Sequence, residues 1–209
     1  MKLMTRFFLV LIFSFPFLGQ AQNRLTREIE LNEIKVLQLN LDEVFAVEII
    51  TGDFAKLKLI SKSEGEYAQE LRLDVNEIDE TLHISSLFDA ILTSGYDKLS
   101  SHKVISFQLK LYVPERLQVY LNSNIANVKL VGKLAYFEAD LKSGACHLLK
   151  HEGNAKINTY RGDIEVETRD AEIKAETRSG TLQLQEANYK KYLLELKSVE
   201  SNIEVIQLN

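Results

Sequence analysis

Residues 155–166 read AKINTYRGDIEV, and residues 173–184 read IKAETRSGTLQL. In both stretches apolar and polar residues alternate on each side of a glycine, Gly162 or Gly180. Alternation with a period of two residues is typical of a β-strand with one buried face. Glycine suits the tight turn between two such strands. The two stretches therefore predict a repeated unit of two short strands joined by a turn, 180 − 162 = 18 residues long.

The same unit occurs five times from Leu117 onward, at intervals of 18 to 21 residues. Its turn residues are Asn124, Gly144, Gly162, Gly180 and Ser201. Of the 25 inward positions in this alignment, 22 are apolar, and the other three are Ser or Thr in a single column. A unit of this size buries its apolar face only when units stack. The repeats thus predict an all-β parallel β-helix, or β-solenoid. An antiparallel meander is the alternative, but it does not require matching columns.

Stacking in chain order would place outward-facing charges beside one another. The favourable neighbours expected are Glu138 with Lys156, Lys174 with Glu195, and Glu176 with Lys197. The same order puts Lys156 beside Lys174, which is unfavourable by a few tenths of a kcal/mol.

Residues 1–21 have the three-part pattern of a cleaved export signal. Lys2 and Arg6 precede an apolar run over 7–18, and Gly19 and Ala21 supply the small residues of a cut after position 21. Twelve residues are too few for a membrane span, which needs about 20. We therefore expect an exported chain (periplasmic, on the outer surface or secreted), with no transmembrane segment after cleavage. Its formal charge is then 23 − 30 = −7.

Residues 22–116 are less regular than residues 117–209, which hold the repeats. Strands are expected here at 35–39, 44–50, 56–60, 71–75, 81–85 and 104–113. We interpret this region as irregular N-terminal coils of the solenoid, or as a β cap over its first open edge. At the other end the chain stops four residues after Val205. We expect the last unit's open edge to be closed by self-association or by the chain folding back.

Composition excludes several classes of function. The 45% hydrophobic and 26% charged residues are ordinary for a globular protein. A single cysteine excludes an intramolecular disulfide framework. The net charge of −5 disfavours nucleic-acid binding. Phosphate-binding loops and calcium-binding nonapeptides do not occur, so no cofactor is expected.

The candidate nucleophile and metal ligands have a structural interpretation. Cys146 falls in an inward column, so it is expected to be a core residue. His147 and His151 have the spacing of a metal pair on a helix, but on a strand His147 faces outward and His151 falls in the next connection. His83 and His102 have no catalytic partner at a diagnostic spacing. No metal or catalytic residue is assigned.

Two further patterns surround the turn at Gly162. Residues 161–163 spell Arg-Gly-Asp, a cell-attachment tripeptide, but its glycine is the turn residue that the repeat needs anyway. Asp163, Glu165 and Glu167 form an acidic edge near Asp170. Clustered acids serve polysaccharide-active β-helix enzymes, although a solvated face is the favoured interpretation.

The repeats also resemble a known family. The motifs that carry the resemblance are Val113-Pro114-Glu115-Arg116-Leu117, Ser143-Gly144, Arg161-Gly162-Asp163-Ile164 and Ser179-Gly180-Thr181-Leu182. With the signal segment they resemble the putative auto-transporter adhesin family (head GIN domain and related putative adhesins) of Bacteroidetes. The resemblance implies a right-handed parallel β-helix on exported proteins, and it carries over no catalytic residue.

Together these features predict an exported, non-enzymatic, adhesin-like protein that acts as a cell-surface or periplasmic binding or structural module. A glycan or a protein partner would lie along the flat outward columns. The alternative is a polysaccharide-active β-helix enzyme that uses Asp163, Glu165 and Glu167.

Overall fold

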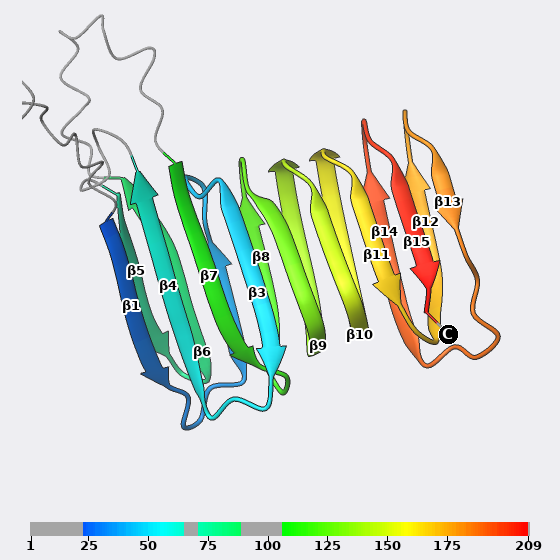
Figure 1. The fold of residues 1–209 in the computed structure, drawn as a ribbon. Helices are drawn as coiled ribbons and strands as arrows, with labels where there is room; N and C mark the ends of the chain where they lie inside the picture. The colour runs from blue at the N-terminus through cyan, green and yellow to red at the C-terminus, as the bar shows by residue number, and fades with distance from the viewer. Residues whose placement is uncertain (1–22, 65–70, 89–105, 209) are drawn as a thin grey trace, which may run out of the picture.

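The computed structural model describes residues 23–64, 71–88 and 106–208, in which the chain forms only strands, turns and irregular segments (Figure 1). The predicted all-β class is confirmed. The expected export signal and His102 lie outside the described residues. Among the residues described, no helix is long and apolar enough to cross a membrane.

Fifteen strands form within the described residues. They are β1 (Asn23–Glu30), β2 (Val36–Asn40), β3 (Ala46–Gly52), β4 (Lys56–Glu64), β5 (Leu71–Ile78), β6 (Thr81–Phe88), β7 (Ser106–Pro114), β8 (Gln118–Ser123), β9 (Asn127–Ser143), β10 (Cys146–Arg161), β11 (Ile164–Thr168), β12 (Ala171–Thr177), β13 (Leu182–Leu184), β14 (Tyr192–Ser198) and β15 (Ile203–Gln207). The six strands expected before residue 117 are all present. β1 was missed because Arg27 interrupts the alternation between Leu25 and Ile29.

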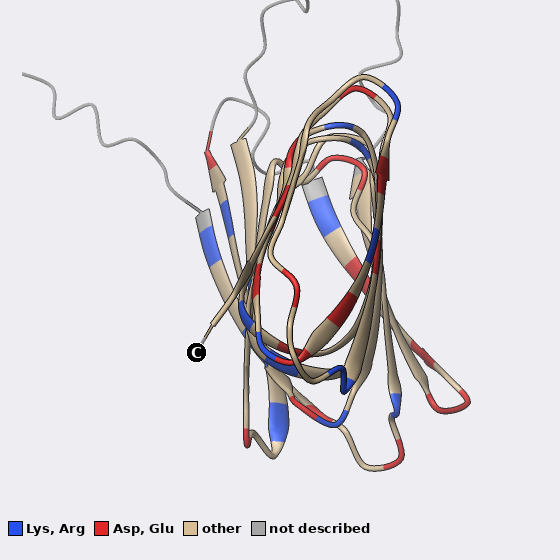
Figure 2. Cartoon of the chain, turned by 90° about the vertical axis from the view of Figure 1, so that its right-hand side faces the viewer, with Lys and Arg blue, Asp and Glu red and all other residues tan. Residues whose placement is uncertain are grey.

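Hydrogen bonding arranges the strands in two series, here called the front wall and the back wall. The front wall runs β1-β4-β7-β3-β9-β10-β11-β15-β13. The back wall runs β5-β6-β2-β8-β9-β10-β14-β12. β9 and β10 bend between the walls, giving their first halves to the front and their second halves to the back. Seen along the stack, the walls face each other across one core (Figure 2).

Pairing is parallel among the repeats and mixed at the N-terminal end. β4 pairs antiparallel with β1 and β7, and β5 pairs antiparallel with β6. β2 pairs in parallel with β6 and β8, and β3 pairs in parallel with β7 and β9. In this region the parallel strands are thus followed outward by antiparallel strands. The β-helix prediction implies a sheet that is parallel throughout, and the antiparallel pairs of β1, β4, β5, β6 and β7 differ from it.

The strands do not stack in chain order at either end. β14 and β15 lie between the β10–β11 pair and the β12–β13 pair. Likewise β2 and β3 lie between β6–β7 and β8–β9. The expected contact of Lys156 with Lys174 is therefore wrong, because Glu195 lies between them in register. The observed order replaces like-charge neighbours with alternating charges. It also makes β12 and β13, not the last strands of the chain, the open end.

Alignment of the repeats on the turn residues Asn124 and Gly144 predicts that Leu117 pairs with Phe137, and this register is wrong by two residues. Phe137 pairs with Val119, not with Leu117, and Cys146 pairs with Val128. A shift of two residues leaves every side chain on the same face of the strand. The apolar pattern therefore cannot detect it. Within the pairs that stack, the columns of the other repeats keep the expected register.

Close stacking of the turns explains the glycines at Gly144 and Gly162. Both have positive φ, 114° and 143°. A Cβ at Gly162 would collide with the backbone of Gly144, and a Cβ at Gly144 would collide with the backbone of Ala126. These glycines thus allow each turn to lie directly on the one before it.

Candidate functional site

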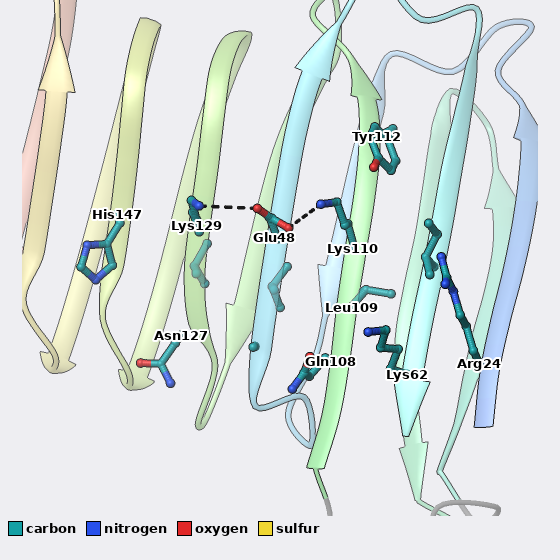
Figure 3. A pocket seen from close by; sticks show the side chains of 14 residues that line it. Arg24, Glu48, Lys62, Gln108, Leu109, Lys110, Tyr112, Asn127, Lys129 and His147 are labelled. Atoms are coloured by element: carbon teal, nitrogen blue, oxygen red, sulfur yellow. Dashed lines mark ion pairs between the residues drawn. The ribbon is translucent and has the colours of Figure 1, made fainter. Parts of the chain in front are cut away.

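A groove of about 570 Å³ lies on the outward face of the front wall, over β1, β4, β7, β3, β9 and β10 (Figure 3). Its lining includes four cationic side chains: Arg24, Lys62, Lys110 and Lys129. Glu48 is the one carboxylate among the described residues that line it. The groove therefore carries an excess of 4 − 1 = 3 positive charges in a chain whose formal charge is −5.

Strand register places Glu48 between two of these cations. Glu48 on β3 lies opposite Lys110 on β7 and Lys129 on β9. Its carboxylate is 2.8 Å from Lys110 Nζ and 3.6 Å from Lys129 Nζ, as the dashed lines in Figure 3 mark. The hydrogen bond from Lys110 lowers the pKa of Glu48 and raises the pKa of Lys110. The single negative charge of Glu48 thus neutralises only one of the two positive charges beside it.

Arg24 and Lys62 bring like charges together. They are register partners on the antiparallel strands β1 and β4. Within the described ranges, no carboxylate forms an ion pair with either side chain. Like charges directly opposite each other on a sheet are destabilising. An anionic group bound between them would remove that repulsion.

The groove also contains an aromatic ring. Tyr112 lines it and makes an edge contact with Phe54, with ring centroids 5.8 Å apart. Lys110 Nζ lies 5.6 Å from the centroid of the Tyr112 ring. An amphipathic ring beside cations offers a ligand both an apolar face and positive charge.

The predicted acidic edge lies on the same wall, beyond His147. Asp163 and Glu165 line a separate hollow of about 210 Å³, and Glu204, which the sequence did not single out, lines it too. Glu167 is not among its lining residues. The structure therefore brings together two of the three predicted acids.

Both predicted acids in the hollow have a structural partner. Asp163 Oδ1 accepts a 2.9 Å hydrogen bond from the backbone N–H of Asn202. Glu165 lies 2.8 Å from Nδ1 of His147, its register neighbour on β10. These contacts join neighbouring coils, as expected of a solvated face.

The Arg-Gly-Asp tripeptide is part of the stacked turns. Arg161 Nε donates a 2.7 Å hydrogen bond to Glu200, and the backbone N–H of Gly162 donates to Ser201 Oγ. With Asp163 bound to the next coil as well, all three residues have a role in coil-to-coil contact.

Cys146 is confirmed as a core residue. Its side chain is buried between Val128 and Ile164. Burial raises the pKa of its thiol to about 12, so the reactive thiolate is suppressed.

The histidines at 147 and 151 point to opposite sides of β10. His147 faces outward, as expected, and lines the groove. His151 was expected in a connection but lies within β10, fully buried, with Nδ1 3.1 Å from the Gly132 carbonyl oxygen. His83 is half-buried on β6. In the part of the chain that is described, no three His, Cys, Asp or Glu side chains gather where they could hold a metal ion.

Sequence reasoning missed the groove because its cations come from four separate strands. Lys110 belongs to an expected strand, but Lys62 lies beyond the strand expected at 56–60, and Arg24 belongs to β1, which was not predicted. The available signal was lysine at outward positions of alternating runs. The order of neighbouring strands in the sheet was also needed to show that these lysines lie close together.

No protein-family model matches the chain, and no curated protein matches it either. Solved structures do. A putative cell adhesion protein from Clostridium sporogenes has a TM-score of 0.52 at 17% identity, over 90% of this chain and 100% of the other. A putative adhesin from Bacteroides fragilis has a TM-score of 0.38 at 11% identity, over 88% and 97%. The first likeness shows a shared fold, and at these identities it shows no more than that.

Proposed function

We propose that this chain is an exported, non-enzymatic, adhesin-like module, and that its groove binds an acidic glycan. The protein would act at the cell surface, in the periplasm or after secretion, and its repeats would form a right-handed parallel β-helix of the putative adhesin family. The proposal rests on one observation. Four cations surround a groove with a single carboxylate, in a chain that is otherwise acidic.

The spread of the cations favours an extended ligand. Lys129, Lys110, Lys62 and Arg24 lie on β9, β7, β4 and β1, which span four strand spacings in the front wall. At about 4.8 Å per spacing this is roughly 19 Å. A polysaccharide with a carboxylate on successive sugars matches such a row, whereas a small anion would contact only one or two cations. Tyr112 adds an apolar face for a sugar ring.

The likeness in fold to a putative cell adhesion protein supports this proposal, as does the resemblance of the repeats to exported adhesins. Binding through outward side chains also suits a solenoid, whose rows form a continuous surface.

Binding of polygalacturonate and of neutral dextran by the purified protein tests the proposal. Polygalacturonate should bind, dextran should not, and added salt should weaken binding. Lys62→Glu should reduce affinity about tenfold, or about 1.4 kcal/mol. Lys142→Glu makes the same charge change at an exposed position outside the groove and should leave affinity unchanged. Equal binding of both polymers, or equal effects of the two variants, would contradict the proposal.

The same samples test the enzymatic alternative. Release of reducing ends from polygalacturonate, abolished by Asp163→Asn, would replace the binding module with an enzyme that uses Asp163, Glu165 and Glu167. A double-stranded DNA arm tests for nucleic acid, for which we expect no specific binding because the chain as a whole is acidic.

A further inference from the structure

The end of the stack formed by β12 and β13 is open. Among the described strands, β12 pairs only with β14, and β13 only with β15. Leu182 and Leu184 on β13 are 43% and 38% exposed, whereas their register partners Ile203 and Val205 are 0% and 1% exposed. β13 thus has the inward apolar pattern of a buried coil without a neighbour to cover it. Unpaired strand edges with exposed apolar residues are sites for adding another strand.

The other end of the same stack shows which kind of strand fits. There β4 pairs antiparallel with β7, and β5 pairs antiparallel with β6. Both walls therefore end in an antiparallel strand at that end. An antiparallel addition to β12 and β13 would complete the open end in the same way.

We propose that a second copy of this chain closes the open end, with β12 paired antiparallel to its own copy and β13 to its own copy. A single two-fold axis perpendicular to the two facing walls produces both pairings. In such an interface each residue of β12 lies opposite a residue of β12 in the second copy, so these facing residues must be compatible in charge and size.

The charges of β12 meet this condition in one register. Centring the pair on Ala175 places Lys174 opposite Glu176 of the second copy, and Glu172 opposite Arg178 of the second copy, the residue that directly follows β12. By symmetry this gives four pairs of opposite charge. Centring on Lys174 or on Glu176 instead sets like charges against each other, which is destabilising.

The same register continues the rows of each monomer. Lys156, Glu195 and Lys174 alternate in sign across the back wall. Glu176 of the second copy would come next, followed by its own partner Lys197, which lies 2.7 Å from Glu176 within one chain. The alternation thus passes through the interface without a break.

Cysteine cross-linking of the full chain tests this register. Ala175→Cys puts a thiol on the two-fold axis, where facing Cα atoms are about 4.5–5.5 Å apart and a disulfide can form. Mild oxidation should give a covalent dimer. Thr177→Cys is the matched control, because its copy lies about four residues away along the strand, out of reach. Cys146 is buried and should not react. Failure of Ala175→Cys to cross-link, or equal cross-linking by both variants, would overturn the proposal.

Light scattering tests the charges independently of the new thiols. The unmodified protein should have twice the mass of one chain. Arg178→Glu should give monomers, because the new carboxylate would lie opposite Glu172 of the second copy at both symmetric positions. Combining it with Glu172→Arg should restore the dimer. Circular dichroism of each variant shows that it is folded. A folded wild-type monomer, or a dimer that Arg178→Glu leaves intact, would overturn the proposal, while the glycan proposal would be unaffected because the groove lies over other strands.

Discussion

Two parts of the front wall carry opposite charge. Over β1 to β9 the outward side chains form a groove of about 570 Å³ with four cations and one carboxylate. Over β11, β15 and β13 they form a hollow of about 210 Å³ with three carboxylates. His147 lies at the boundary, since it lines the groove and contacts Glu165. Register stacking turns one outward position per coil into a continuous row, so the charge of a site depends on which coils are neighbours.

The two parts also differ in residue type and in cavity size. The acidic part contains the residue types that polysaccharide-active enzymes use, but Asp163 and Glu165 are bound to neighbouring coils. The basic part contains the larger cavity and two cations that face each other. Under the proposed function, ligand binding falls to the basic part, while Asp163 and Glu165 in the acidic part contact neighbouring strands. The following predictions test this division, from the largest expected effect to the smallest.

Gly162→Ala should disrupt the stacking on which both parts depend. A Cβ at this position collides with the turn at Gly144, and φ is 143°. We expect a loss of about 3 kcal/mol in the free energy of unfolding, measured by urea denaturation. Ser143→Ala, at the exposed last position of β9, serves as the control and should cost less than about 0.5 kcal/mol. Equal effects would show that the turns do not need close contact.

His151→Leu should remove part of the protein's acid sensitivity. Burial lowers the pKa of His151 from 6.5, so the unfolded chain binds a proton before the folded chain does. Stability is therefore full above about pH 6.5 and falls as the pH drops toward the lowered pKa.

Thermal unfolding between about pH 7 and pH 5 measures this effect. The melting temperature of the wild type should fall more steeply than that of His151→Leu. His147→Gln, outside on the same strand, is the control. An unchanged slope in His151→Leu would mean that the buried imidazole does not control the acid response.

Glu48→Gln should change binding and stability in opposite directions. It removes the one carboxylate of the groove and leaves Lys110 and Lys129 without their ion-pair partner. Affinity for polygalacturonate should rise about threefold, while stability at neutral pH falls by less than about 1 kcal/mol. Because the pKa of Glu48 is lowered, its stabilising contribution is present above pH 4.5 and is lost as the pH falls further.

Titration calorimetry and acid denaturation measure these two effects. Glu138→Gln removes a similar carboxylate, paired at 2.7 Å with Lys156 on the back wall, and should leave affinity unchanged. Weaker binding by Glu48→Gln would mean that this carboxylate contacts the ligand itself.

Glu165→Gln should have the smallest effect. Its contact with His147 is exposed, and exposed ion pairs contribute less than about 1 kcal/mol. Affinity for polygalacturonate should change less than in Glu48→Gln, because Glu165 lies outside the groove. A larger change than that of Glu48→Gln would place the acidic part within the binding site.

The sequence was sufficient for most of the strands and for most of the inward columns. Alternation around Gly162 and Gly180 is a local property, and it correctly predicted the register partners Ile173 with Leu194 and Leu182 with Ile203. Cys146 was correctly placed in the core by the same pattern.

Neighbour order could not be obtained from that pattern. Apolar columns look the same in any stacking order, and a slip of two residues keeps the same face. Charge contained some of the missing information, since Glu195 lies between Lys156 and Lys174 and separates two like charges. The groove depended on the order too, because β4 and β1 add Lys62 and Arg24 beside β7 through antiparallel pairing.

Lysine footprinting in the presence of polygalacturonate tests the central claim most directly. The protein is acetylated with and without the polymer, and each lysine is quantified by mass spectrometry. We predict protection of Lys62, Lys110 and Lys129, which line the groove, and unchanged labelling of Lys174 and Lys197 on the back wall. Equal labelling of all five lysines in the presence of bound polymer, or protection confined to the back wall, would contradict the assignment of ligand binding to the groove.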